Sequence, residues 1–240
     1  DLFHEPYAAT WGIGPNETRW DVAAARIGNQ LLDACPSWLV IVEGVGQCGG
    51  SCDSCAPHGC WWGENLVGAL SHPIALSVPS KLVLSPHVFG HGAHGYFQDA
   101  AFPRNMPPIW WKHWARVPSA TGHAVLLGEW GGLWSAVTHN GRTRAGTRAW
   151  QEQLTDYLVG QGMGFFYASL TDGGHRIGSL FGGDQGVSAP ALAMLARVNT
   201  TLITELETSW RHRPPARPRP PVSPPPRTPA PPPAPAPPVP

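Results

Sequence analysis

The chain has 240 residues, enough for one large domain or for one domain with a tail. Lys plus Arg and Asp plus Glu number 16 each, so the formal net charge is zero, which argues against a general polyanion binder. No apolar run of about 18 residues occurs, so no membrane-spanning helix is predicted. Twelve Trp beside only 13% charged residues indicate a ligand that stacks on rings, and the neutral charge favours a sugar over a nucleobase.

The composition changes sharply near the carboxyl end. Residues 211–240 hold 16 of the 28 prolines and five arginines, with no acidic and no aromatic residue. Such a segment cannot bury a core, so the sequence predicts a folded domain over residues 1–210 and a disordered, Pro/Arg-rich tail or linker over 211–240. A passive spacer and a docking segment for a proline-recognition module both remain open for this tail.

Helical and strand patterns alternate along the folded part. A helical pattern over residues 18–34 ends before Pro36, and short apolar, strand-like runs alternate with further helical patterns. The strands are expected at 39–42, 82–84, 124–127 and 165–168, and the later helices at 105–117, 143–159 and 191–207. This order predicts an α/β fold built from βαβ units with a parallel sheet.

Polar residues follow the carboxyl ends of the predicted strands: Glu5, Glu43, His87, Glu129 and Ser169. In a (β/α)8 barrel all strand ends meet on the face that carries the chemistry, whereas a doubly wound sheet gathers them only near a switch point. No Gly-rich phosphate loop follows any strand, so nucleotide binding is not supported and no cofactor is expected.

Five motifs then resemble glycoside hydrolase family 5, in family order across roughly residues 1–200. The chain is most similar to the endo-β-1,4-glucanases (cellulases) of that family. The motifs stand at residues 1–7, at 42–44 with 61–66, at 85–89, at 102–107 and at 128–132. The resemblance implies a (β/α)8 TIM barrel and a retaining hydrolase of β-1,4-glucan that acts by double displacement, with the polysaccharide as partner.

The resemblance also implies the roles of individual residues. Glu5 matches the general acid/base and Glu129 the nucleophile, a pair that retaining glycosidases hold about 5–5.5 Å apart. The implied substrate-binding residues are His4, His87, Trp62 and Phe89. Glu43 matches a position that is usually structural, and Trp130 is expected to serve packing.

Three positions depart from the family pattern. His4 stands where the family has Asn, Phe89 where it has Tyr, and Ala168 where it has a Trp platform. By the resemblance, each change removes or alters a contact near the cleavage point. The expected weakening of transition-state binding is comparable to that caused by deleting one hydrogen-bond donor to the transition state. A catalytically impaired carbohydrate-binding remnant is therefore the alternative to an active hydrolase, and an incomplete coding sequence is a third reading.

By the resemblance, the chain opens at the fourth strand, which implies a barrel truncated to strands 4–8 and about 100 residues missing upstream. No signal peptide is visible, but the enzyme class predicts a secreted protein, and we expect a monomer.

The sequence holds five cysteines, at positions 35, 48, 52, 55 and 60. The C-x3-C-x2-C-x4-C spacing of the last four is irregular for zinc, so no metal is expected. Local disulfides are favoured, with zinc and free thiols left as alternatives.

Overall fold

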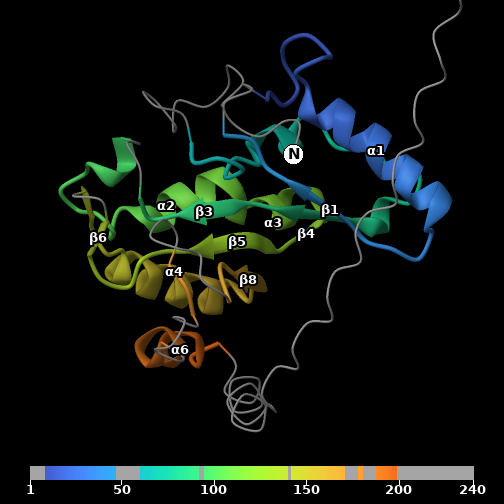
Figure 1. The fold of residues 1–240 in the computed structure, drawn as a ribbon. Coiled ribbons are helices and arrows are strands. Elements are labelled where there is room, and N and C mark those ends of the chain that lie inside the picture. Colours follow the sequence, from blue (N-terminus) through green and yellow to red (C-terminus); the bar gives the residue numbers. More distant parts are fainter. Residues whose placement is uncertain are drawn as a thin grey trace, which may run out of the picture. The chain divides into compact units, whose positions relative to one another are not determined.

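The computed structural model describes residues 9–46, 60–91, 95–139, 142–170, 178–180 and 188–198 (Figure 1). The helical elements are α1 (Trp20–Ala34), η2 (Val67–Leu70), η3 (Pro79–Lys81), η4 (Gly95–Phe97), α2 (Met106–Trp110), η5 (Trp111–Ala115), α3 (Val117–Thr121), α4 (Arg148–Gln161) and α6 (Ala189–Leu195). The strands are β1 (Val40–Glu43), β2 (Leu82–Ser85), β3 (His87–Phe89), β4 (Ala124–Val125), β5 (Leu127–Gly131), β6 (Val137–His139), β7 (Arg142–Arg144) and β8 (Phe165–Tyr167).

The main strands are parallel and follow one another in chain order. One ladder runs β1-β2-β4 and the next β3-β5-β8, and only Pro86 and Leu126 separate the strands that continue from one ladder into the other. Proline cannot donate to a ladder, but the carbonyl of Pro86 still accepts the amide of Gly128 at 3.1 Å. The predicted parallel α/β arrangement is therefore confirmed for these strands.

Helix α1 lies close to its predicted range of 18–34 and ends at Ala34, two residues before Pro36. Its first turn carries Asp21, where a negative charge suits the positive end of the helix dipole. The Asp21 carboxylate accepts the Gly12 amide at 3.0 Å and pairs with Arg19 at 2.5 Å, so this buried side chain ties the preceding loop to the helix.

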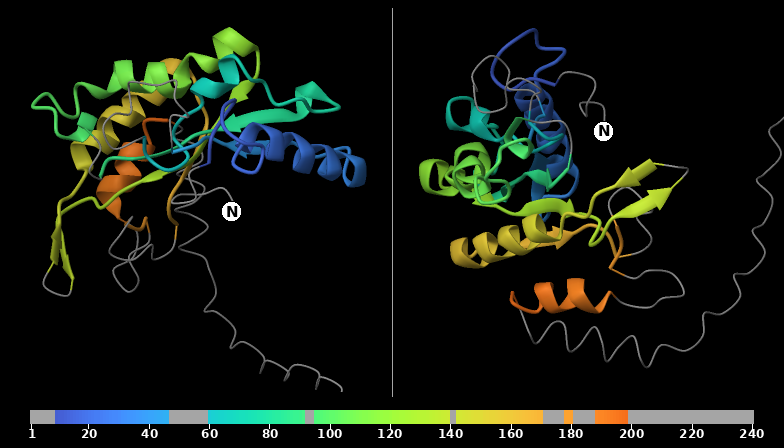
Figure 2. Two further views of the ribbon diagram at one scale, coloured as in Figure 1. Left: turned by 90° about the horizontal axis from the view of Figure 1, so that it is seen from above. Right: turned by 90° about the vertical axis from the view of Figure 1, so that its left-hand side faces the viewer.

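The prediction of one helix over residues 143–159 was wrong at its start. The antiparallel hairpin β6–β7 occupies the chain up to Arg144, and α4 begins only at Arg148. The signal that was missed is Asn140-Gly141, the dipeptide typical of a tight hairpin turn between two short strands. The hairpin projects from the rest of the domain, as the second view of Figure 2 shows.

The helix predicted over 105–117 consists of three consecutive elements. Helix α2 passes into the π-helix η5 and then into α3, which ends at Gly122 with φ +75°. Trp110 and Trp114 lie four residues apart in this stretch and are both fully buried. Of the helix predicted over 191–207, the structure describes α6, and residues 199–207 lie outside the described residues, as does the predicted tail.

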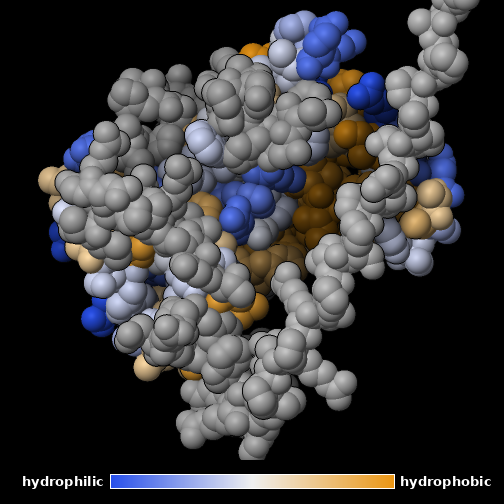
Figure 3. Space-filling view, viewed as in Figure 1, coloured by the Kyte–Doolittle hydropathy of each residue, from blue (hydrophilic) through white to orange (hydrophobic). Residues whose placement is uncertain are grey.

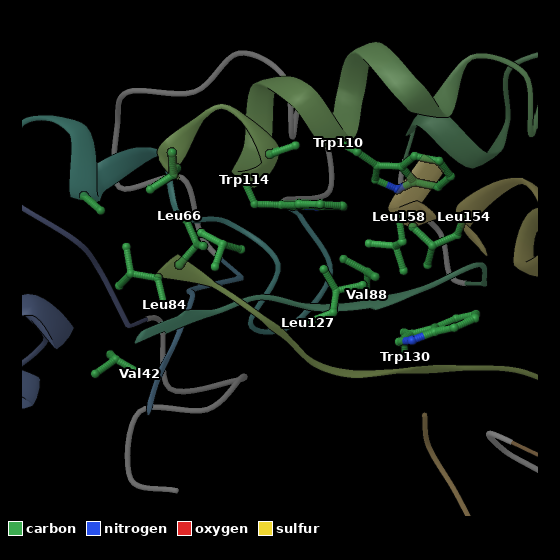
Figure 4. Packing of buried hydrophobic residues seen from close by; sticks show 14 of the residues in the cluster. Val42, Leu66, Leu84, Val88, Trp110, Trp114, Leu127, Trp130, Leu154 and Leu158 are labelled. Atoms are coloured by element: carbon green, nitrogen blue, oxygen red, sulfur yellow. The ribbon is translucent and has the colours of Figure 1, made fainter. Parts of the chain in front are cut away.

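The core lies between the parallel strands and the helices that cover one of their faces. Trp110, Trp114, Leu154 and Leu158 point toward the strand residues of β3 and β5 (Figure 4). Trp130 is fully buried on β5 and packs edge-on against Phe165 and Tyr167, with ring centroids 5.2 and 5.0 Å away. Its packing role was predicted and is confirmed. No described helix is long and apolar enough to cross a membrane.

The opposite face of the sheet is open. Along β1, Val40 and Val42 are buried toward the helices, whereas Ile41 between them is 50% exposed, as the alternation of a strand requires. Phe166 on β8 is likewise 57% exposed. Hydrophobic residues accordingly gather in a recess over the sheet beside α1 (Figure 3). In a closed barrel this face would be filled by side chains from the remaining strands.

Candidate active site

Three polar side chains, Glu43, His87 and Glu129, come together where the β1-β2-β4 ladder passes into the β3-β5-β8 ladder. His87 and Glu129, which were expected just beyond strand ends, lie within β3 and β5. Glu43 ends β1 and is paired in register with Ser85, which ends β2. His87 opens β3 and is paired in register with Glu129 of β5. Parallel pairing thus brings residues 43, 87 and 129 to one edge of the sheet, although they are far apart in the sequence.

The imidazole of His87 lies between the two carboxylates. Its Nδ1 is 2.9 Å from Glu43 Oε1 and 3.3 Å from Glu129 Oε2. The Glu43 and His87 side chains are 21% and 23% exposed, whereas Glu129 is 41% exposed and is the most accessible of the three. Glu43 therefore anchors the ring, and Glu129 presents a carboxylate that a ligand can reach.

Two glycines make this close packing possible. A Cβ on Gly63 would lie 2.0 Å from Glu43 Oε1, and one on Gly128 would lie 2.1 Å from Ser85 Oγ and 2.7 Å from His87 Nε2. Gly63 also has a φ of +73°, a conformation that side chains disfavour. Its carbonyl accepts the backbone amide of His87 at 3.1 Å. The glycines are therefore part of the site's geometry.

Replacing Gly63 with Ala should lower the thermal midpoint and displace the Glu43 carboxylate, because the new methyl group occupies the oxygen's place. Gly122 is the matched control, since its φ is +75° but a Cβ there meets nothing within 4 Å. Gly122→Ala is expected to cost about 1 kcal/mol from backbone conformation alone, and Gly63→Ala about 2 kcal/mol more. Urea unfolding measures the free energy of unfolding of both variants. Equal decreases would show that the Glu43 carboxylate moves away from the new methyl group without a loss of stability.

An aromatic surface adjoins the carboxylates. Trp61 packs against Phe89 and His91, with ring centroids 5.2 and 4.7 Å away, and against Trp62 at 6.1 Å with the planes tilted by 31°. Trp62 is 47% exposed, whereas Phe89 is only 4% exposed. Trp62 thus offers ring surface to a ligand, and Phe89 supports the rings from beneath.

A buried polar network behind this surface was missed by the sequence reasoning. The carboxylate of Glu64, 2% exposed, lies 2.8 Å from His113 Nδ1 and accepts the hydroxyl of Tyr96 at 2.6 Å and the amide of Trp61 at 3.1 Å. Burial alone would raise the pKa of Glu64, but the charge and hydrogen bond of His113, with the Tyr96 and Trp61 donors, lower it below its usual value. The only signal was an acid inside an aromatic and apolar run.

A second buried network fixes β8. Tyr167 donates its hydroxyl to Gln151 Oε1 at 2.8 Å, and Gln151 Nε2 donates to Thr147 Oγ1 at 3.2 Å. Burial raises the pKa of Tyr167 to about 12. Ala168, which follows, is 9% exposed and donates its amide to the Trp130 carbonyl at 2.7 Å, so β8 ends against the strand that carries Glu129.

Several predicted residues lie outside the described part of the chain. These are His4, Glu5, Cys48, Cys52 and Cys55. The separation of Glu5 from Glu129, the position of His4 and the pairing of the loop cysteines therefore stay predictions. Of the remaining cysteines, Cys35 is a half-buried free thiol, and Cys60 is buried with its sulfur 3.8 Å from His113 Nδ1.

Carboxylates that gather on neighbouring parallel strands, beside exposed tryptophan, are typical of α/β proteins that place their chemistry on the strand-end face of a (β/α) barrel. The chain belongs to the cellulase family, glycosyl hydrolase family 5, which it matches over residues 1–174.

Curated relatives and solved structures agree with this assignment. An endoglucanase of Paenibacillus polymyxa is 35% identical over 208 residues, which cover 85% of this chain and 50% of that protein. The major extracellular endoglucanase of Xanthomonas campestris pv. campestris is 37% identical, with 75% of this chain and 36% of that protein covered. The chain thus spans half or less of the length of these two relatives.

An endocellulase from Pyrococcus horikoshii, solved with cellotetraose in a glutamate-to-alanine variant, superposes with a TM-score of 0.68 at 34% identity, over 79% of this chain and 51% of that one. The fold therefore corresponds to part of a family 5 catalytic domain.

Proposed function

We propose that the protein is a retaining glycoside hydrolase that cleaves β-1,4-glucan by double displacement. The observation that carries this proposal is the position of Glu129 in a family 5 domain: its side chain lies on β5, is 41% exposed and is 3.3 Å from His87 Nδ1. The names of the endoglucanase relatives and the cellotetraose bound to a structural neighbour support the choice of β-1,4-glucan.

The proposed mechanism uses two carboxyl groups. The carboxylate of Glu129 attacks the anomeric carbon while Glu5, protonated, gives its proton to the departing glycosidic oxygen. The resulting glycosyl ester on Glu129 is then hydrolysed by a water that Glu5 deprotonates, which restores both groups and retains the configuration. His87 holds Glu129 in the attacking orientation and is itself fixed by Glu43.

Direct substrate binding is proposed for His4, His87 and Trp62, and an indirect contribution for Phe89. The exposed face of Trp62 suits a glucose ring, because sugars stack their C–H faces on aromatic rings. Phe89 is buried, so its proposed contribution is to support Trp61 and, through it, the exposed ring.

A carbohydrate-binding protein without turnover is the second candidate. It is favoured by Phe89 and Ala168, which stand where the family resemblance places Tyr and Trp. Phe89 has no hydroxyl to offer Glu129, and Ala168 gives no ring for the sugar at the cleavage point. Both losses would weaken transition-state binding more than they weaken sugar binding.

Release of reducing ends from soluble β-1,4-glucan, with cellotetraose binding measured by calorimetry, separates the two candidates. A hydrolase releases reducing ends, and Phe89→Tyr should raise kcat by roughly tenfold if the new hydroxyl reaches Glu129. Binding of cellotetraose with no release, by the parent and by both Phe89→Tyr and Ala168→Trp, would reject the hydrolase and support the binding protein.

The wider setting of the protein is also proposed. We expect secretion, in line with the relative that is named an extracellular endoglucanase, and local disulfides in the loop that holds Cys48, Cys52, Cys55 and Cys60. The barrel portion is proposed to comprise strands 4–8 over residues 1–210, followed by the Pro/Arg-rich tail, in a monomeric protein that needs no cofactor.

A further inference from the structure

We infer that Glu64 is a positioning residue, which fixes the turn of Trp61, Trp62 and Gly63 so that the exposed ring and His87 are both held in place for a glucan chain. The inference rests on the proposed function for the identity of the ligand. It concerns a residue that lies beneath the site and is too deeply buried to touch substrate, since its side chain is 2% exposed.

The contacts of Glu64 converge on one turn. Its Oε2 accepts the Trp61 amide at 3.1 Å, and the Glu64 amide donates back to the Trp61 carbonyl at 3.0 Å, which closes the turn on itself. Tyr96 Oη, itself bonded to the carboxylate, also accepts the Trp61 amide at 3.2 Å. His113 holds the other oxygen, Oε1, from the π-helix η5.

The same turn reaches both parts of the site. Trp62 within it is half-exposed beside Trp61, and the Gly63 carbonyl accepts the His87 amide at 3.1 Å. Directly after the turn, Asn65 exchanges two backbone hydrogen bonds with Val45, at 2.9 and 3.0 Å. A shift at Glu64 therefore moves the ring surface and the backbone of His87 together.

A role in stability alone does not explain this arrangement well. Buried ion pairs recover little more than their cost of desolvation, and an apolar residue of similar volume often stabilises a core as well. What an apolar residue cannot do is accept a hydrogen bond from the Trp61 amide and set its direction. The lowered pKa of Glu64 agrees with a carboxylate that stays charged and accepts from all of its neighbours.

The test compares Glu64→Gln and Tyr96→Phe with the parent in the full chain. An amide has one acceptor oxygen where the carboxylate has two, and Tyr96→Phe removes one donor but keeps the ring that packs on Phe97. Thr155→Val is the matched control, because Thr155 is fully buried and, among the described residues, its hydroxyl donates to the Gln151 carbonyl of the same helix, at 2.9 Å.

Two measurements decide the inference. Hydrogen exchange of the peptide over residues 60–66 measures how well the turn is ordered in the absence of ligand. The Kd for cellotetraose, with KM and kcat where turnover exists, measures how the turn affects ligand binding. We expect faster exchange and an approximately fivefold weaker Kd in both variants, a larger change in KM than in kcat, and an unchanged Kd in Thr155→Val.

The outcomes separate this inference from the proposed function. Unchanged exchange, or faster exchange with an unchanged Kd, would overturn the positioning role even if the parent is an active hydrolase. A parent that binds cellotetraose without cleaving it would reject the hydrolase, and the Kd of the variants would still decide on Glu64. A parent that does not bind cellotetraose would contradict both.

Discussion

Glu129→Gln should abolish the release of reducing ends from β-1,4-glucan, with a fall in kcat of about 10⁴-fold or more, the scale seen when an enzyme loses its nucleophile. The amide keeps the size of the side chain but cannot form the glycosyl ester on which double displacement depends. Because the Glu129 side chain is 41% exposed, the substitution should leave the fold intact.

A matched substitution distinguishes the loss of the Glu129 carboxylate from a general effect of replacing a surface glutamate. Glu152 lies on α4, is 38% exposed and pairs with Arg148 at 2.9 Å on the surface. Glu152→Gln should leave kcat and the thermal midpoint nearly unchanged, since a single exposed ion pair contributes little. Cellotetraose binding should survive in Glu129→Gln. Retained hydrolysis in that variant would show that another group attacks the sugar.

Trp110→Ala should be the most destabilising of the substitutions considered, at about 3–5 kcal/mol. The Trp110 side chain is fully buried, and its ring lies 6.1 Å from Trp150 and 5.2 Å from Tyr157, so its loss leaves a cavity between α2 and α4. For a domain of this size the thermal midpoint should fall by roughly 10 °C, at 2–4 °C for each kcal/mol.

The neighbouring residue supplies the control. Trp111 has the same side chain one position along, but it is 48% exposed. Trp111→Ala should cost about 1 kcal/mol or less, because little buried surface and no closed cavity are involved. Thermal unfolding followed by circular dichroism measures both variants. Equal losses at the two positions would contradict the core packing seen in Figure 4.

The sequence predicted the parallel sheet well because its strands are short apolar runs with clear boundaries. The run at 82–84 became β2, and the run at 124–127 became β4 and the start of β5. The polar residues that follow these runs, His87 and Glu129, are neighbours in register on β3 and β5. Strand-end position is a local property of the sequence, so residues that share it can be found without knowing the fold.

Properties that depend on contacts between distant segments could not be predicted in the same way. Glu64 and His113 are 49 positions apart, and neither carries a signal that names the other as its partner. Glu43 can lie beside His87 because Gly63 has no Cβ in the space that the Glu43 carboxylate occupies, a contact that is visible only in the packed structure. The hairpin β6–β7 was missed for a simpler reason. The predicted helix began at residue 143, which lies inside β7, and the Asn-Gly turn signal just before it was not used.

The anomeric configuration of the first product tests the central claim most directly. Proton NMR during hydrolysis of cellotetraose distinguishes the α-anomer from the β-anomer before mutarotation mixes them. Double displacement through Glu129 predicts that the β-anomer appears first, with the α-anomer rising later. Early accumulation of the α-anomer would mean direct attack by water, and would contradict the assignment of Glu129 as a nucleophile.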